Sequence, residues 1–366
     1  MLGFACYIPS SRIAMTAVVQ GTPIVTGSVV AQDAKPSLHR TNTARLVEHG
    51  WPAGLIDAMA ESVAVFPERY VIVDNSGSMQ STDGSRLIHT QDGGRRSIRA
   101  TRWAELGDLV VEMAEVATKI NSPTHFHLLN ESELGQLFTV SDCGASVDKL
   151  KAVMKTTPRS TTPLTEAVQQ VTQKIRPSRA TLTAKGQKVV VVLCTDGLPN
   201  DPTSFLRALQ ELQRLPVWLV VRLCTSEDSI VEYWSELDKQ LEAPLETLDD
   251  VEGESREIYP KNAWLTYAPA LHLARTMGLH DRLFDLIDEV PLLPSQAKQL
   301  CERILGCDEL PEPELDEHAF KAALGSALSQ MPNVYNPIKK KMTPWVDVDR
   351  IMGRRRCVDS GFCAIS

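Results

Sequence analysis

The segment Arg69-Tyr-Val-Ile-Val-Asp-Asn-Ser-Gly-Ser78 joins a short apolar run to a polar turn. Its Tyr-Val-Ile-Val run predicts a buried parallel strand, because a strand covered by helices on both faces carries apolar side chains on both faces. Asp74 follows at the carboxyl end of that strand. Gly77 permits a tight turn, which presents the hydroxyls of Ser76 and Ser78 beside the carboxylate.

Strands and helices alternate on the C-terminal side of this segment. Lys188–Cys194 is the clearest further strand, with four consecutive valines, and the helix expected at 101–120 has apolar residues at three- and four-residue steps. The alternation predicts an α/β fold, a doubly wound, mostly parallel, Rossmann-like sheet with helices on both faces. The other expected strands are 125–129, 137–140, 217–223 and 245–248, and the other expected helices are 145–154, 163–175, 204–214 and 229–241.

Composition shifts divide the chain into five expected regions. The first is rich in Ser, Thr, Gly and Val and has little helical period, and the fourth is helical and punctuated by prolines. The last is basic and ends in a short lipidation-like motif. The regions are a flexible leader at 1–40, a helical lead-in at 41–65, the α/β domain at 66–280, a helical extension at 281–335 and a basic tail at 336–366.

Charge and cysteine usage exclude several classes of protein. The net charge of −8 creates no basic field for nucleic acid. The eight cysteines form no CxxC pair, so we expect no zinc site and a reducing compartment. The first residues lack the basic and apolar parts of a secretory signal, and no run approaches the roughly 18 apolar residues of a membrane span. We therefore expect a cytoplasmic protein.

Two further loops carry oxygen ligands toward the same sheet edge. Thr162 precedes Pro163, which suits the first turn of the helix at 163–175, so we expect Thr162 to cap that helix. Asp196 follows the strand that ends at Cys194. Ligands of open α/β sheets bind outside the carboxyl ends of the strands. Each element alone also fits a plain structural role, as a polar turn, a helix cap or an Asp-Gly turn. Together they predict an oxygen-liganded Mg²⁺ or Mn²⁺.

The order and spacing of these residues resemble the metal-ion-dependent adhesion site of von Willebrand factor A domains. Asp74, Ser76 and Ser78 match the DxSxS element of that family, Thr162 matches the threonine of its second loop, and Asp196 matches the aspartate of its third. The resemblance implies that the serine hydroxyls bind the metal directly and that the threonine binds it directly or through water. It also implies that the aspartates act largely through water and that a carboxylate from the partner fills the last position.

The resemblance covers roughly residues 66–280 and departs from the family pattern in two places. The second loop reads Ser160-Thr-Thr-Pro-Leu164 where the family often has glycines, and residues 80–100 form a longer insertion than usual. Neither departure removes a ligand. The insertion can reshape what reaches the metal.

We expect a metal-dependent protein-binding module and not an enzyme. A site with only two carboxylates leaves the cation electrophilic, so it attracts a Glu or Asp of a protein partner. Two alternatives stay open: a metal-dependent hydrolase or phosphotransfer enzyme with Asp74 as nucleophile, and a scaffold whose metal is purely structural. Against the enzyme, the loop offers hydroxyls where such a phosphotransferase would want a second carboxylate.

The last four residues, Cys363-Ala-Ile-Ser366, fit the C-a-a-X prenylation pattern, and the terminal serine favours farnesyl. One prenyl chain anchors only marginally, so a second signal is needed. Cys357 offers a second lipid site, and Arg354, Arg355 and Arg356 can contact anionic lipid. These features predict a lipoprotein on the inner face of a membrane. The alternative is a disordered tail with an incidental cysteine.

Overall fold

The computed structural model describes residues 46–47, 50–91, 93–141, 144–225, 227–241, 243, 245–307 and 309–352. The expected leader lies outside the described residues. So do the lipidation cysteines, Cys357 and Cys363, and the arginines Arg354, Arg355 and Arg356, so prenylation and membrane contact stay predictions. Among the described helices, none is both long enough and apolar enough to cross a membrane.

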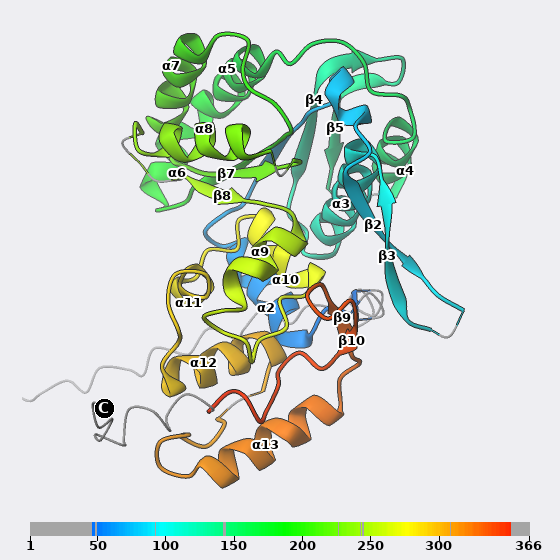
Figure 1. Ribbon diagram of the computed structural model, residues 1–366. Helices are drawn as coiled ribbons and strands as arrows, with labels where there is room; N and C mark the ends of the chain where they lie inside the picture. The colour runs from blue at the N-terminus through cyan, green and yellow to red at the C-terminus, as the bar shows by residue number, and fades with distance from the viewer. Residues whose placement is uncertain are drawn as a thin grey trace, which may run out of the picture. The chain divides into compact units, whose positions relative to one another are not determined.

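A six-stranded sheet forms the centre of the fold, in the order β5-β4-β1-β6-β7-β8 (Figure 1). Every neighbouring pair is parallel except β4 and β5, which are antiparallel at one edge. This arrangement confirms the predicted doubly wound, mostly parallel α/β fold. The strands are β1 (Arg69–Val73), β4 (Thr124–Ser132), β5 (Gly135–Val140), β6 (Val189–Thr195), β7 (Val217–Leu223) and β8 (Glu246–Leu248).

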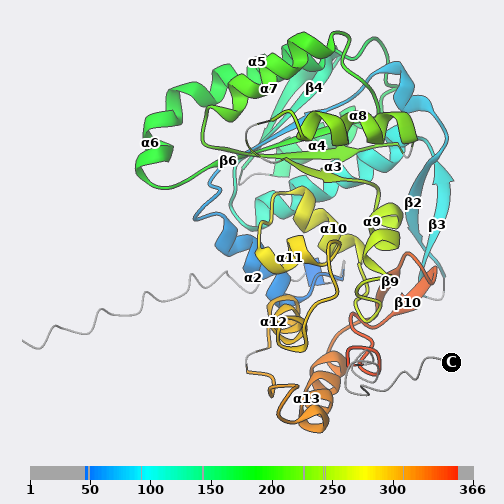
Figure 2. The same cartoon turned by 60° about the vertical axis from the view of Figure 1, so that its left-hand side comes forward.

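Helices cover both faces of this sheet, and successive residues of β1 supply both cores. Val71 and Val73 belong to the core beneath α3 and α4, whereas Tyr70 and Ile72 belong to the core beneath α5, α7 and α8 (Figure 2). Side chains of a strand alternate between faces, so an apolar run is needed to fill both cores. These helices are α3 (Arg102–Lys119), α4 (Gly144–Val153), α5 (Leu164–Ile175), α6 (Arg179–Ala184), α7 (Pro202–Gln213) and α8 (Asp228–Asp238).

The insertion at 80–100 is a β-hairpin, which the sequence pattern did not indicate. A short 3₁₀ turn, η1 (Gly77–Gln80), precedes it. Strands β2 (Gly84–His89) and β3 (Arg95–Ala100) pair antiparallel and extend away from the sheet (Figure 1). Neither strand has a fully buried residue, so the apolar alternation that signals a strand is weak here.

The helical extension shares the hydrophobic core on the α3 side of the sheet. One apolar cluster contains Leu55 of the lead-in, Val71 of the sheet and Leu300 of the extension. The domain boundaries read from the sequence stay predictions, because this cluster runs across residue 280. The helices are α2 (Ala53–Ser62), α9 (Val251–Ile258), α10 (Pro269–Thr276), α11 (Arg282–Leu286), α12 (Pro294–Leu305) and α13 (Glu317–Ser329).

The segment 336–352, which we expected to begin a basic tail, is folded and hydrogen-bonded to residues 264–266. Strands β9 (Val334–Asn336) and β10 (Lys341–Thr343) pair antiparallel. Trp345 is 1% exposed, and its carbonyl accepts a hydrogen bond from the backbone N–H of Thr266. Four apolar residues after the three lysines at 339–341 are therefore core residues: Trp345, Val346, Ile351 and Met352.

A glycine makes the contact between α2 and α12 possible. A β-carbon on Gly54 would lie 2.3 Å from the backbone nitrogen of Gly306 and 2.4 Å from the carbonyl oxygen of Arg303. Backbone atoms cannot move aside as a flexible side chain can. Gly54→Ala is therefore expected to lower the free energy of unfolding by about 1–3 kcal/mol, although alanine favours an isolated helix by about 1 kcal/mol.

Gly325→Ala in α13 is the matched control, because a β-carbon there meets nothing within 4 Å. It should raise the free energy of unfolding by about 0.5–1 kcal/mol. Urea denaturation of both variants measures the difference. Equal effects of the two substitutions would contradict the close helix crossing.

Candidate functional site

The carboxyl ends of β1 and β6 bring two aspartates together. The strands are neighbours, with Val73 opposite Cys194, and the backbone N–H of Asp74 donates to the carbonyl of Cys194 at 3.0 Å. Asp74 and Asp196 therefore leave adjacent strands at the same edge. Their exposed fractions are 0% and 1%, so two carboxylates are buried side by side.

A chain of hydrogen bonds joins the loop after β1 to the loop after β6. The Ser78 hydroxyl donates to Asp196 Oδ1 at 2.8 Å, and the hydroxyl oxygens of Ser76 and Ser78 lie 3.0 Å apart. A hydroxyl has one proton and two lone pairs. Since Ser78 donates its only hydroxyl proton to Asp196, Ser76 must be the donor in the hydrogen bond between the two serines. Both hydroxyls keep lone pairs for a further ligand.

Both oxygens of Asp74 are held by neighbours that carry no charge. Oδ1 accepts from the backbone N–H of Ser76 at 2.9 Å, and Oδ2 accepts from the hydroxyl of Thr195 at 2.7 Å. Burial raises the pKa of Asp74; hydrogen bonds from Ser76 and Thr195 lower it in part, and the charge of Asp196 raises it further. Sequence reasoning missed Thr195, whose only signal is its place at the end of a buried strand.

The second expected loop folds onto the first. The backbone N–H of Gly77 donates to the carbonyl of Ser160 at 3.1 Å. Thr162 is half-buried beside the β6 loop, since a β-carbon on Gly197 would lie 3.9 Å from its hydroxyl oxygen. The structure thus brings all five residues to one edge.

The expected capping role of Thr162 is wrong. Helix α5 begins at Leu164 with Pro163 as its N-cap, and no side chain caps it. Pro163 has a ψ of 60°, outside the helical region, so the helix starts one residue later than the proline position predicts. The hydroxyl of Thr162 is therefore not used as a cap.

A pair of asparagines links these loops to β4. The sequence pattern did not predict this role. Asn75 donates through Nδ2 to the carbonyl of Asn130 at 2.9 Å and accepts from the Asn130 N–H at 2.8 Å. Asn130 in turn donates to the carbonyl of Thr161 at 2.8 Å. Strand β4 and the two loops are thereby held in one arrangement.

Arg102, at the start of α3, brings a positive charge into contact with Asp196. Its Nη1 donates to Asp196 Oδ2 at 2.9 Å, and its other nitrogens donate to both oxygens of Asp83, at 2.8 and 2.6 Å, and to Glu227 at 2.8 Å. The side chain is 5% exposed. Hydrogen bonding to Asp83 raises the pKa of Arg102, burial opposes this, and the bonds to Glu227 and Asp196 add to the rise. The sequence offers no signal for this role.

The chemistry of the donors restricts which metal could bind. In the part of the chain that the structure describes, no three His, Cys, Asp or Glu side chains gather to hold a metal ion. A cation at this edge would depend on hydroxyl oxygens as well as carboxylates. Such an all-oxygen set suits a hard cation such as Mg²⁺ or Mn²⁺ and does not suit zinc.

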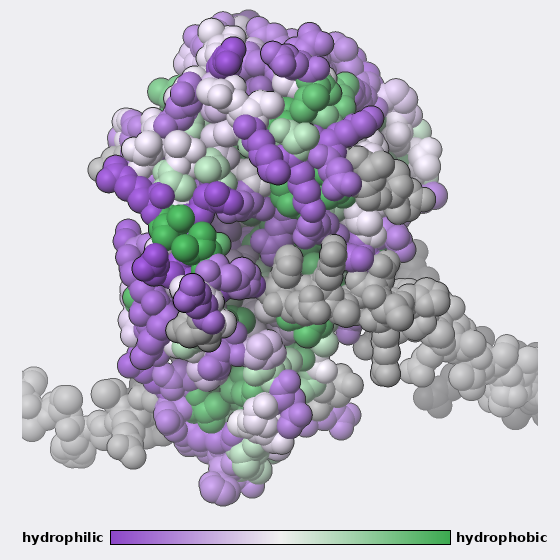
Figure 3. Space-filling view, turned by 90° about the vertical axis from the view of Figure 1, so that its right-hand side faces the viewer, coloured by the Kyte–Doolittle hydropathy of each residue, from purple (hydrophilic) through white to green (hydrophobic). Residues whose placement is uncertain are grey.

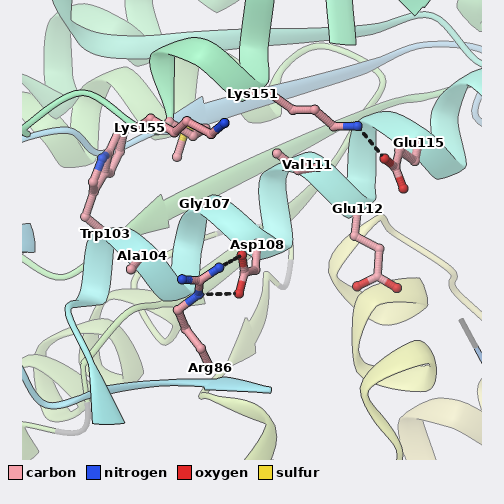
Figure 4. A pocket seen from close by; sticks show the side chains of 11 residues that line it. Arg86, Trp103, Ala104, Gly107, Asp108, Val111, Glu112, Glu115, Lys151 and Lys155 are labelled. Carbon is pink, nitrogen blue, oxygen red and sulfur yellow. Dashed lines mark hydrogen bonds and ion pairs between the residues drawn. The ribbon is translucent and has the colours of Figure 1, made fainter. Parts of the chain in front are cut away.

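A separate pocket of about 660 Å³ lies beside α3 and α4 and contains none of the five residues (Figure 4). Two ion pairs line it, Arg86 with Asp108 at 2.6 Å and Lys151 with Glu115 at 2.7 Å, and Glu112 accepts a hydrogen bond from the indole N–H of Trp51 at 3.2 Å. The side of the molecule that carries the hairpin is mostly hydrophilic, with apolar side chains in several separate areas (Figure 3). The pocket therefore gives no alternative location for the metal chemistry.

Comparison with known proteins identifies no family. No family model matches the chain, and no curated protein shows significant similarity to it. Among solved structures, manganese-loaded TRAP protein of Plasmodium vivax has 18% identity over 51% of this chain and 69% of its own, with a TM-score of 0.34. Proximal thread matrix protein 1 from the mussel byssus has 16% identity over 43% of this chain and 38% of its own, with a TM-score of 0.28. Overlap this limited assigns neither a family nor a function.

Proposed function

We propose that this protein is a non-catalytic, metal-dependent protein-binding module of the von Willebrand factor A type. Asp74, Ser76, Ser78, Thr162 and Asp196 hold Mg²⁺ or Mn²⁺, and the metal takes a Glu or Asp carboxylate from a protein partner. The observation that carries the proposal is the hydrogen-bond chain from Ser76 through Ser78 to Asp196, beside the buried Asp74.

This arrangement fits a cation in two respects. Ser78 can keep its proton on Asp196 and accept from Ser76 while its remaining lone pair binds the metal, so binding breaks no hydrogen bond there. Asp74 is a buried carboxylate that no described Lys or Arg pairs with, and the cost of burying it falls when a cation comes near.

The charge balance favours an acidic partner. One of the two carboxylates, Asp196, is already paired with Arg102. A divalent cation held by one free carboxylate and neutral hydroxyls keeps a net positive charge. That charge attracts a carboxylate from outside.

The geometry speaks against the enzymatic alternative, in which Asp74 attacks a phosphoryl group. The Asp74 side chain is fully buried, and each of its oxygens already accepts a hydrogen bond. A nucleophile needs an oxygen that can reach the substrate. Asp74 is therefore better suited to help bind a metal ion than to form a covalent intermediate.

Ser78→Ala is expected to weaken Mn²⁺ binding by at least about tenfold, because it removes one ligand and frees Asp196 from its hydroxyl donor. Titration followed by electron paramagnetic resonance of free Mn²⁺ measures the affinity. Ser81→Ala is the matched control, since Ser81 is exposed on the same loop and outside the ligand set. Unchanged Mn²⁺ affinity in Ser78→Ala would contradict the site.

The binding role is tested in the same samples with acetate as the probe. Acetate should replace a water on the bound Mn²⁺ and lower the relaxation rate of water protons. If Mn²⁺ binds but acetate has no effect, the metal is structural, and the partner-binding part of the proposal is wrong.

A further inference from the structure

Asp196 is held from two sides by groups of different charge. The neutral hydroxyl of Ser78 contacts Oδ1 at 2.8 Å, and the guanidinium of Arg102 contacts Oδ2 at 2.9 Å. Ser78 is exposed, whereas the side chain of Arg102, the first residue of α3, is buried. Oδ1, on the side of the serines, is thus the oxygen of Asp196 that can interact with a cation. Oδ2 is occupied by its ion pair with Arg102.

Two acidic side chains from distant segments hold Arg102 in this position. Asp83, at the base of the β2–β3 hairpin, forms a two-point contact with the guanidinium, and Glu227, after β7, contacts Nη2 at 2.8 Å. Asp83 and Glu227 are 44% and 57% exposed. Arg102 therefore shares its charge among three carboxylates, of which only Asp196 is fully buried.

We propose that Arg102 is a positioning residue that partly neutralises the charge of Asp196. Compared with a site that lacks this arginine, the site then binds the cation more weakly and the bound cation attracts an acidic ligand more strongly. The inference rests on the proposed function, because it concerns the same site. An aspartate whose charge is partly neutralised attracts a cation less. The cation that does bind then retains more positive charge for a carboxylate from the partner.

Loss of Arg102 should have opposite effects on the two ligands. Arg102→Met is expected to raise Mn²⁺ affinity by at least about tenfold, since Asp196 then has no cation other than the metal. The acetate effect on proton relaxation should fall in the same variant. Arg102→Lys keeps the charge and should retain affinity within a few-fold of the wild type. A purely structural arginine would instead lower Mn²⁺ affinity when replaced by methionine.

A second variant covers the case in which Arg102→Met does not fold. Asp83→Asn with Glu227→Gln leaves Arg102 in place and directs its whole charge to Asp196. Both altered residues are more than two-fifths exposed, so the fold should persist. Mn²⁺ affinity should fall by about two- to fivefold, the effect of exposed ion pairs.

The outcomes separate this inference from the proposed function. If the wild type binds no Mn²⁺, the proposed function fails. If the wild type binds Mn²⁺ but Arg102→Met binds it equally or less well, only the role of Arg102 is overturned. Unchanged or higher affinity in the Asp83/Glu227 double variant likewise overturns that role.

Discussion

Asp74→Asn is expected to abolish stabilisation of the protein by Mn²⁺ while leaving the metal-free protein at least as stable as the wild type. Burial raises the pKa of Asp74, so the ionised carboxylate costs stability at neutral pH when no cation is near. The asparagine removes that cost. It also removes the charge that a divalent cation needs.

The hydrogen bonds around position 74 can survive this substitution. The amide oxygen can accept from the backbone N–H of Ser76, as Oδ1 does now. The hydroxyl of Thr195, which already accepts a bond from Gly197 at 3.2 Å, can turn to accept from the new amide group. A loss of metal binding would therefore not be a consequence of misfolding.

Denaturant unfolding with and without Mn²⁺ measures both effects. At a metal concentration of about 100 times Kd, the wild type should gain about 2.7 kcal/mol, and Asp74→Asn should gain close to nothing. Asp148→Asn, on the exposed side of α4, is the matched control and should behave as the wild type. An equal gain in Asp74→Asn and the wild type would refute the role of Asp74.

Arg275→Met should be the most destabilising single change, with a loss of about 3–5 kcal/mol in the free energy of unfolding. Arg275 is 4% exposed and pairs with Glu246, Glu254 and Asp288 at 2.9, 3.0 and 2.8 Å. These partners lie on β8, on α9 and beyond α11. Without the guanidinium, the buried carboxylate of Glu254 and the partly buried carboxylates of Glu246 and Asp288 lose their shared positive partner.

The stability loss in Arg275→Met should depend on pH, whereas a simple loss of packing would not. Burial raises the pKa of Glu254 to about 7, although Arg275 opposes the rise. Because the pKa of Glu254 is higher in the folded protein than in the unfolded chain, the protonated side chain stabilises the fold in acid. This stabilisation is lost as the pH rises through the pKa of the folded protein. Without Arg275 the pKa rises further, so the loss in Arg275→Met should be larger at pH 7.5 than at pH 5.5.

Arg256→Met is the control for this comparison. Arg256 is 67% exposed on α9 and pairs with Glu252 one turn away. Its loss should cost no more than about 1 kcal/mol at either pH. If Arg275→Met resembles this surface variant, the buried network contributes little to the fold.

The sequence by itself determined the sheet and the place where a site would form. Uninterrupted apolar runs such as Val189–Thr195 must be buried on both faces, which requires parallel strands with helices on each side. Polar residues directly after such strands must meet at one edge. Asp74, Ser76, Ser78 and Asp196 could therefore be expected at one edge from the order of strands and loops taken together, and the structure places them there.

Only the tertiary structure decided what surrounds those residues. Arg102 lies 94 positions before Asp196 on a helix whose sequence pattern shows a plain amphipathic face, and Gly54 meets Gly306 across helices far apart in the chain. The periodicity of apolar residues predicts which face of a helix or strand is buried. It does not predict which distant element covers that face. The charge at the site and the close helix crossing depend on such pairings, so they become visible only once the chain is folded.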